Sequence, residues 1–138
     1  MKIGMAVEQK GVPVGVLTDA ANVGEPDLAQ RLLEQMPPEV ETPQGAPVLA
    51  DRGFDSDTLR EELADEGFEL LAPHRKNRTR PSGNDGRKMR RYRRRYVVER
   101  TFAWLHSYRR LLVRHEYYSF VYDGFLYLAC ALIAVGQF

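Results

Sequence analysis

Apolar residues alternate with small or polar residues at the start of the chain. The alternation runs through residues 2–8, and it resumes over residues 12–18 after a short polar break that contains Gly11. A period of two is typical of β-strands, and a glycine-containing break between two such runs suits a hairpin turn. The sequence therefore predicts an antiparallel hairpin.

Helical spacing and short apolar runs predict the remaining elements. Leucines recur every three to four residues after Pro26, and Pro37 ends that helix. Gly67 ends a second predicted helix. The expected helices cover residues 25–36, 58–66, 89–113 and 120–135, and the expected strands cover 46–50 and 68–71. The order β-β-α-β-α-β-α-α defines the α/β fold class.

The C-terminal run 120–135 is apolar except for Asp123 and Gly124. A membrane-spanning helix needs about 20 apolar residues, so this shorter run predicts a buried core helix and no membrane segment. Cys130 is the single cysteine, and we expect it to be a small core residue. One cysteine allows neither an intramolecular disulfide nor a cysteine-based zinc site, which fits a cytoplasmic protein.

The net charge of +1 hides an uneven distribution. Residues 1–74 hold 5 basic and 15 acidic residues, whereas residues 75–100, called the basic segment below, hold 12 basic and 2 acidic residues. Its cations are Arg75, Lys76, Arg78, Arg80, Arg87, Lys88, Arg90, Arg91, Arg93, Arg94, Arg95 and Arg100. Such a cluster is expected of a protein that binds a phosphate backbone. A basic surface that only aids solubility is the alternative.

Asp51 stands where α/β domains place functional groups. It follows the apolar run 46–50 at the end of a predicted strand, and open α/β sheets bind ligands at such ends. Gly53 would let the backbone approach a ligand closely. The alternative is that Asp51 only caps a turn or helix.

Glu99 is a second candidate carboxylate. In a continuous helix it shares one face with Tyr92, Arg95 and His106, and neighbouring apolar residues predict that it is partly buried. A buried carboxylate is costly unless it is paired or binds a metal. The alternative is a simple Arg95–Glu99 ion pair along the helix, worth about 0.3–0.5 kcal/mol if exposed.

Two motifs resemble those of insertion-sequence DDE transposases. Residues 51–55, Asp-Arg-Gly-Phe-Asp, resemble the D-R-G-[YF]-D block around that family's second catalytic Asp. Tyr92, Arg95, Glu99 and His106 match the spacing of its Y-x2-R-x3-E-x6-K signature, with His106 in place of the usual Lys or Arg. The hairpin and the terminal apolar helix also resemble the family, so the resemblance covers nearly the whole chain.

This resemblance implies an RNase H-like fold and two-metal cleavage and rejoining of DNA, with Mg²⁺ or Mn²⁺ as cofactor. It implies that Asp51 and Glu99 are catalytic metal ligands. The DNA-binding residues that it implies are Tyr92, Arg95 and His106 near the cleaved end, and Arg75, Lys76, Arg78, Arg91 and Arg94 along the flanking double-stranded DNA.

The family's first catalytic Asp lies on a central strand before the hairpin, whereas this sequence begins at the hairpin. We therefore expect residues 1–138 to be a single, partial catalytic domain with a basic loop over 74–89 and unpaired sheet edges. Glu8 fits a turn-flanking residue and is not expected to replace the missing Asp. We expect no transposase activity from this polypeptide alone. A decayed element, a frameshifted second frame and an earlier start codon all stay open.

Three other interpretations stay open. The main one is a non-catalytic DNA-binding remnant or a regulator of a full-length transposase, which uses the basic segment without a metal. Another is an RNA-associated basic protein, although no RNA-recognition signature is visible. The last is a small protein that forms homo-oligomers through its apolar C-terminal helix.

Overall fold

A hairpin opens the structure, which is a computed structural model that describes residues 1–77 and 86–136. β1 (Lys2–Val7) pairs antiparallel with β2 (Pro13–Asp19), as the alternation predicted. The Glu8 carboxylate accepts hydrogen bonds from two backbone N–H groups of the turn, at 2.7 and 3.0 Å. Glu8 therefore serves the turn, in agreement with the turn-flanking role expected for it.

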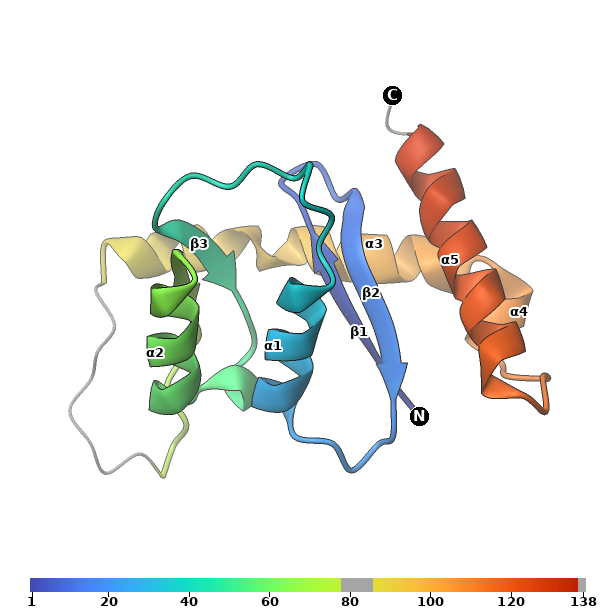
Figure 1. Cartoon of the computed structure of the whole chain (residues 1–138), viewed down its shortest axis with the longest axis horizontal. Helices are drawn as coiled ribbons and strands as arrows, with labels where there is room; N and C mark the ends of the chain where they lie inside the picture. The colour runs from blue at the N-terminus through green and yellow to red at the C-terminus, as the bar shows by residue number, and fades with distance from the viewer. Residues whose placement is uncertain (78–85, 137–138) are drawn as a thin grey trace.

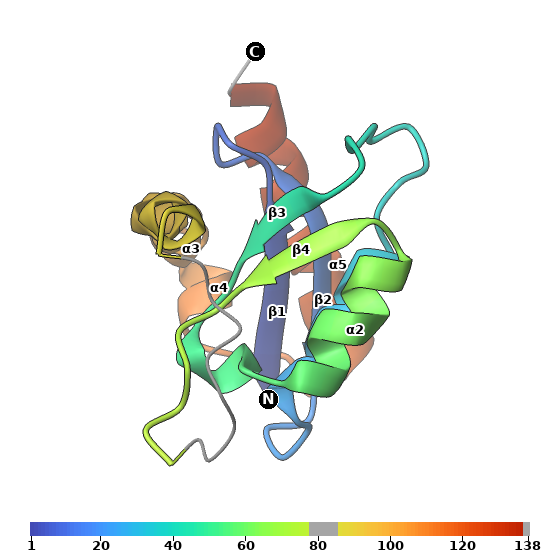
Figure 2. The same ribbon diagram turned by 90° about the vertical axis from the view of Figure 1, so that its left-hand side faces the viewer.

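A second pair of strands is parallel. β3 (Ala46–Leu49) pairs with β4 (Phe68–Leu71), and α2 (Asp57–Asp65) makes the crossover that a parallel pair requires. Ser56 caps α2, and Gly67, at φ +87°, follows its end. Figure 2 looks onto this pair with α2 beside it. Within the described residues no backbone hydrogen bonds join the parallel pair to the hairpin. The α/β class is therefore confirmed, with two small sheets.

Leucines fix two helices on these sheets. α1 (Glu25–Glu34) buries Leu28 and Leu32 against the hairpin, and α2 buries Leu59 and Leu63 against β4. In both helices the two leucines are four residues apart, which places them on one face.

The single helix expected over 89–113 is wrong: three shorter helices take its place. η2 (Lys88–Arg95) is a 3₁₀ helix, α3 (Tyr96–His106) is an α-helix, and α4 (Arg109–Leu112) is one further turn. η2 holds six cations and no acid. Like charges three and four residues apart repel on an α-helical surface, and none of the η2 side chains that the structure describes, residues 89–95, is buried to offset that repulsion.

The break after α3 has a local cause. The Ser107 hydroxyl donates a hydrogen bond to the Trp104 carbonyl at 2.6 Å, which competes with the backbone hydrogen bonds of the helix. Tyr108 is then extended, at φ −82° and ψ 114°. Because this stretch contains neither glycine nor proline, the sequence indicated neither the 3₁₀ segment η2 nor the break after α3.

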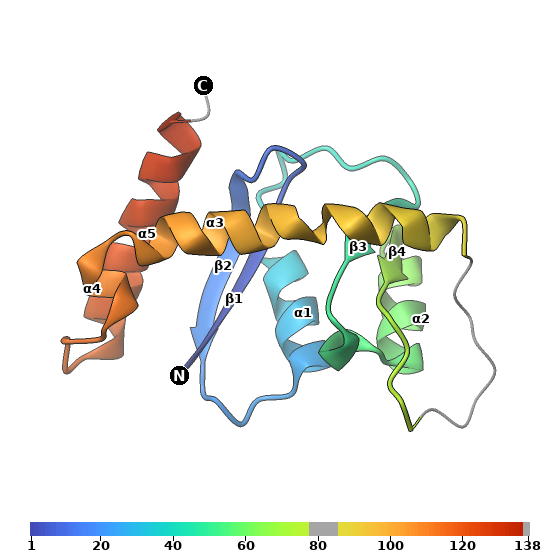
Figure 3. The same cartoon turned by 180° about the vertical axis from the view of Figure 1, so that it is seen from behind.

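η2 and α3 together form one rod across the face of the strands opposite α1 and α2 (Figures 1 and 3). α3 packs against β1, and η2 packs against β3 and β4. The rod therefore bridges the two sheets. Thr101 of α3 is fully buried, and its hydroxyl lies 2.7 Å from the carbonyl of Gly11 in the hairpin turn.

The last helix, α5 (Ser119–Gly136), packs on the protein by one face only. Its buried residues are Tyr122, Leu126, Ala129, Cys130 and Ile133. The expectation of a buried core helix is therefore only half right, because the opposite face is exposed. Length and composition alone would allow α5 to cross a membrane, yet its inner face belongs to the core of the hairpin. Cys130 is a core residue as expected, and burial raises the pKa of its thiol to about 11.

We expect Thr101→Val to weaken the junction between the rod and the hairpin. The change keeps the side-chain shape but removes the hydroxyl that donates to buried Gly11. The free energy of unfolding, measured by urea denaturation, should fall by about 1–2 kcal/mol. Thr58→Val, at an exposed position on α2, is the matched control and should change it by less than about 0.5 kcal/mol. Equal losses in the two variants would contradict the assignment.

Candidate active site

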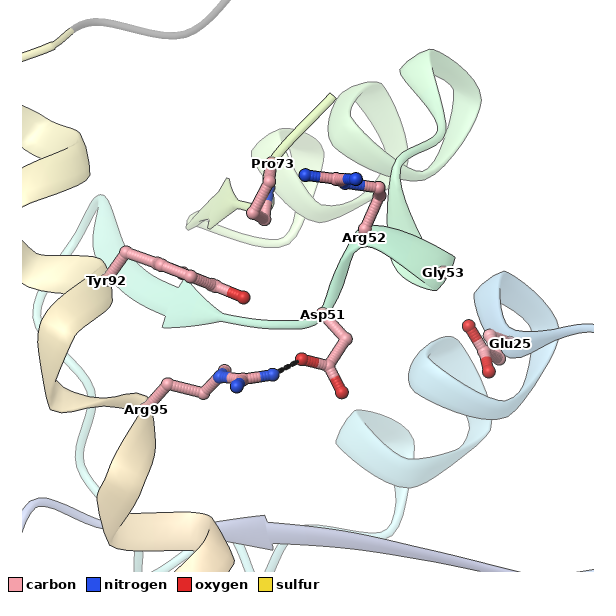
Figure 4. Close-up of a pocket in the computed structure, with 7 residues that line it drawn as sticks. All are labelled: Glu25, Asp51, Arg52, Gly53, Pro73, Tyr92 and Arg95. Atoms are coloured by element: carbon pink, nitrogen blue, oxygen red, sulfur yellow. Dashed lines mark hydrogen bonds and ion pairs between the residues drawn. The ribbon is translucent and has the colours of Figure 1, made fainter. Parts of the chain in front are cut away.

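Asp51 lies just beyond the carboxyl end of β3, in an open depression of about 510 Å³ (Figure 4). The lining residues are Glu25, Asp51, Arg52, Gly53, Pro73, Tyr92 and Arg95. They come from the start of α1, the loop after β3, the segment after β4, and η2. Three residues predicted from the sequence, Asp51, Tyr92 and Arg95, are therefore brought together here.

Asp51 does not use its side chain as a cap. It precedes η1 (Arg52–Phe54), a single 3₁₀ turn, yet its carboxylate accepts no capping hydrogen bond from that turn. The carboxylate points instead toward Arg95 of the rod (Figure 4). The capping alternative considered for Asp51 is therefore wrong.

The Arg95 guanidinium stands between two carboxylates. Its Nη1 donates to Asp51 Oδ1, and its Nη2 lies 2.7 Å from Glu99 Oε1. This ion triad links the end of β3 to the rod. The side chains of Asp51 and Glu99 are 57% and 58% exposed, and exposed ion pairs stabilise a fold by at most about 1 kcal/mol. The triad therefore concentrates charged groups at the site and adds little to the free energy of unfolding.

Glu99 is exposed, whereas the sequence predicted partial burial. α3 turns Val97, Thr101 and Leu105 toward the core. Glu99 is two residues from both Val97 and Thr101, which is more than half a helical turn, so its side chain points away from the core. The prediction rested on the apolar neighbours of Glu99, but these turn a different face of α3 toward the core. The 3₁₀ geometry of η2, with about three residues per turn, affects only how Tyr92 and Arg95 are placed relative to the side chains of α3.

A third carboxylate, Glu25, was not predicted. It stands in the first turn of α1 and lines the same depression (Figure 4). A Cβ on Gly53 would overlap a Glu25 carboxylate oxygen, so the absence of a side chain at Gly53 makes room for Glu25. From the sequence, Gly53 is expected to let a ligand approach the backbone, whereas in the structure the Glu25 side chain lies against it. An acid in a first turn is also favoured by the helix dipole, so the sequence gave no specific signal for Glu25.

Tyr92 brings an aromatic ring and a hydroxyl to the depression. The Arg95 guanidinium lies 5.4 Å from its ring centroid, in cation–π range. Burial raises the pKa of Tyr92; nearby Arg52 lowers it and Glu99 raises it further. The phenol is therefore protonated at neutral pH and can donate a hydrogen bond.

Asp55 anchors the loop that carries Asp51. Its side chain is 3% exposed and accepts hydrogen bonds from Arg60 Nη1 at 2.5 Å and from the Arg75 backbone at 2.7 Å, with His74 Nδ1 at 3.1 Å. Burial by itself raises the pKa of this carboxyl, but the hydrogen bonds outweigh burial and hold its pKa at about 2. Asp55 thus ties the loop after β3 to the segment after β4.

The remaining predicted DNA-binding residues lie outside the depression. The Arg75 guanidinium donates to the Gly53 carbonyl at 2.6 Å, so it borders the site. Exposed residues that do not line it are Lys76, Arg91, Arg94 and His106. His106, at the end of α3, has its ring 6.3 Å from that of Phe102. Arg78 and half of the expected basic loop 74–89 fall outside the described residues.

The carboxylates can be tested against the predicted metal. Within residues 1–77 and 86–136, no group of three or more His, Cys, Asp or Glu side chains could hold a metal ion. Asp51 and Glu99 nevertheless offer oxygen ligands, which Mg²⁺ prefers, and Mg²⁺ needs few protein ligands because it keeps several waters. Both carboxylates already face one shared cation, the Arg95 guanidinium. Asp51 and Glu99 thus supply two oxygen donors of the kind that a divalent ion takes, and the Arg95 guanidinium stands between them.

The chain belongs to the transposase DDE domain family, which matches residues 1–134. The insertion-sequence DDE transposases expected from the motifs are thereby confirmed as its family.

Two relatives carry names of the same kind. The chain is 36% identical over 135 residues to a Burkholderia cepacia protein named as a transposase for insertion sequence element IS402; the match covers 94% of this chain and 60% of that protein. It is 30% identical over 133 residues to a Brucella ovis protein named as a transposase for insertion sequence element IS6501, covering 96% of this chain and 95% of that protein. The chain thus spans about three fifths of the length of the first relative. No solved structure matches the chain.

We expect Asp55→Asn to destabilise the protein in a pH-dependent way. The folded pKa of about 2 lies below the ordinary value of 3.8, so the ionised carboxyl stabilises the fold above about pH 4, and this contribution is lost as the pH falls toward 2. At pH 7 the variant should lose on the order of 1–2 kcal/mol, allowing for solvent screening. Urea denaturation across a pH series measures the difference.

Asp65→Asn, at an exposed position near the end of α2, is the control and should alter stability little at any pH. A loss in Asp55→Asn that stays constant from pH 7 to pH 2 would contradict the electrostatic origin.

Proposed function

We propose that this chain is a partial catalytic domain of DNA transposition, and that the depression of Asp51 is its part of the site where DNA phosphodiesters are cleaved and rejoined. The observation that carries the proposal is the meeting of Asp51 and Glu99 on one guanidinium, from a strand end and a helix far apart in the chain. Membership of the transposase DDE domain family, and relatives named as insertion sequence transposases, support it. Residues 1–138 would then form one domain.

The proposal includes an RNase H-like fold. In its support, an antiparallel hairpin is followed by a parallel pair joined through α2, with helices on both faces (Figure 1). Asp51 follows the carboxyl end of β3, which is where α/β sheets carry their ligands. The depression also opens between elements from separate parts of the chain, as binding sites between layers commonly do.

We assign Asp51 and Glu99 as ligands of Mg²⁺ or Mn²⁺. A divalent cation held there supplies Lewis acidity toward a phosphate oxygen and toward a water or hydroxyl. Among the described residues the Arg95 guanidinium pairs with both carboxylates, and we assign it to a non-bridging phosphate oxygen. Tyr92 is assigned to the same phosphate as a hydrogen-bond donor.

The exposed arginines of η2 would hold the flanking DNA. Arg90, Arg91, Arg93 and Arg94 are exposed, and η2 also supplies two residues of the depression. Cations in this position contact phosphates and carry no sequence information by themselves. His106, at the far end of α3, is assigned to DNA further from the reacting phosphate.

The metal assignment predicts a metal-dependent gain in thermal stability. Mn²⁺ at about ten times its Kd should raise the midpoint of thermal unfolding by about 3–6 °C, because a ligand of the folded state stabilises that state by mass action. Asp51→Asn should abolish this rise. Glu61→Gln, an exposed carboxylate-to-amide change on α2, should leave it intact. An equal rise in wild type and Asp51→Asn would place the metal elsewhere.

The DNA assignment predicts a salt dependence. Each phosphate contact adds about 0.9 to the slope of log affinity against log salt concentration, so the double variant Arg91→Ala with Arg94→Ala should reduce that slope by about 2. Arg109→Ala, at an exposed position on α4, is the control and should leave it unchanged. Fluorescence anisotropy with a short duplex at several salt concentrations provides the measurement. An unchanged slope in the double variant would contradict phosphate contacts by η2.

A non-catalytic DNA-binding protein is the second candidate. It is favoured by the ion triad, because Arg95 pairs with both carboxylates without any metal. Glu99→Gln separates the two functions. With either function the variant should keep its DNA affinity. If the chain binds a metal through Glu99, Mn²⁺ should raise the thermal stability of the wild type and not of the variant; if the chain binds no metal, Mn²⁺ should raise neither.

A further inference from the structure

Three aromatic rings stand exposed where the chain passes from α4 into α5. Tyr117, Tyr118 and Phe120, called the aromatic platform below, are 88%, 59% and 69% exposed. They lie at the end of the molecule away from η2 (Figures 1 and 3). Large rings are costly to leave in water, and neighbouring exposed apolar groups mark an interaction site. The aromatic platform is therefore a candidate binding surface.

The three rings pack on one another. Tyr118 and Phe120 are stacked, with their centroids 5.4 Å apart and 26° between their planes. Tyr117 meets Tyr118 edge to face, with 5.0 Å between the centroids. Aromatic pairs prefer these two geometries, so the rings hold each other in place and present their surfaces together.

Charged side chains hold the backbone that carries the rings. The Glu116 side chain is only 5% exposed, and its carboxylate accepts hydrogen bonds from Arg110 Nη1 at 3.0 Å and from the His115 backbone N–H at 3.3 Å. The Arg114 guanidinium donates to the carbonyls of Glu116 and Tyr117, at 3.2 and 3.4 Å. The aromatic platform is thus ordered before any ligand arrives, which lowers the entropy that binding costs.

The same stretch carries an excess of cations. Residues 108–120 hold three arginines, Arg109, Arg110 and Arg114, against one acid, Glu116. Rings beside positive charge are the combination by which proteins bind single-stranded nucleic acid, because the bases stack on the rings and the cations attract the phosphates. The paired bases of a duplex are already stacked on one another and leave the rings no free face. The aromatic platform therefore fits unpaired bases.

We propose that the aromatic platform is a binding site for single-stranded DNA, in which unpaired bases stack on Tyr117, Tyr118 and Phe120 and the nearby arginines attract the phosphates. DNA is the relevant nucleic acid because the chain belongs to the transposase DDE domain family. The platform is separate from the depression, which none of its three residues lines. It needs no metal, so its test can fail while the proposed function stands.

Two oligonucleotides of equal length and charge separate base stacking from phosphate binding. One consists of about eight deoxythymidines, within the roughly 4–16 nucleotides that single-stranded sites cover, and the other has the same backbone without bases. The wild-type chain should bind the thymidine oligonucleotide at least about fivefold more tightly than the abasic one, since a stacked base contributes about that factor or more. Fluorescence anisotropy at one salt concentration measures both Kd values.

Exchange of the tyrosines tests which rings are responsible. Tyr117→Ala with Tyr118→Ala should remove the preference for the thymidine oligonucleotide and leave the affinities for the abasic oligonucleotide and for a duplex unchanged. Tyr117→Phe with Tyr118→Phe keeps the rings and should keep the preference. Tyr127→Ala, at a tyrosine that is 54% exposed and two turns further along α5 than Phe120, is the matched control and should also keep it. These positions are exposed, so every variant should retain the circular dichroism spectrum of the wild type.

Photochemical cross-linking gives a second readout. A 5-iododeoxyuridine in place of one thymidine forms a covalent bond to an aromatic side chain on which it stacks. After irradiation and digestion with trypsin, mass spectrometry should find the adduct on the peptide that begins at His115, within residues 117–120.

Several results would overturn the proposal. One is equal affinity of the wild-type chain for the two oligonucleotides. Another is a preference that persists in the double alanine variant, or adducts found on η2 and not on residues 117–120. A last one is binding to phosphatidylglycerol vesicles that the double alanine variant loses while the two oligonucleotides bind equally, because the aromatic platform would then be a lipid contact.

Discussion

The packing of one rod across two separate sheets is the constraint on which the rest of the structure depends. No backbone hydrogen bonds join the hairpin to the parallel pair within the described residues, so their relative position rests on side chains. α3 holds β1 through apolar contacts and through buried Thr101, and η2 lies on β3 and β4. Because apolar packing is non-directional, the buried Thr101 hydroxyl, which donates to the Gly11 carbonyl, does much to set the register between hairpin and rod.

The candidate site follows from this packing. Asp51 comes from the end of β3, whereas Arg95 and Glu99 come from either side of the junction between η2 and α3. Asp55 fixes the loop of Asp51 with a buried, hydrogen-bonded carboxylate, while Asp51 itself stays exposed. The two acids of the block 51–55 thus have different roles. Asp55 is hydrogen-bonded inside the protein and holds the loop, and Asp51 presents its oxygens to the depression.

The sequence predicted elements with strong local signals and failed where the signal was tertiary. Alternation gave the hairpin, leucine spacing gave α1, and Gly67 gave the end of α2. The rod was misjudged because charge repulsion in η2 and the Ser107 side chain break a stretch that contains no helix breaker. The exposure of Glu99 was missed because apolar neighbours along the chain do not show which face of α3 turns toward the core. Glu25 reaches the depression only through the fold, since no spacing along the chain relates it to Asp51.

The uneven charge of the chain places its most cation-rich helix and its apolar surface at different ends of one molecule. The cations of η2 lie at one end of the rod and α5 lies at the other (Figure 1). The six cations of η2 repel one another, and at a few ångströms each such pair repels by about 1–4 kcal/mol. An anionic partner bound there relieves this repulsion, whereas the exposed positions of α5 offer such a partner no charge. Electrostatics therefore reserves the basic end of the rod for an anionic partner.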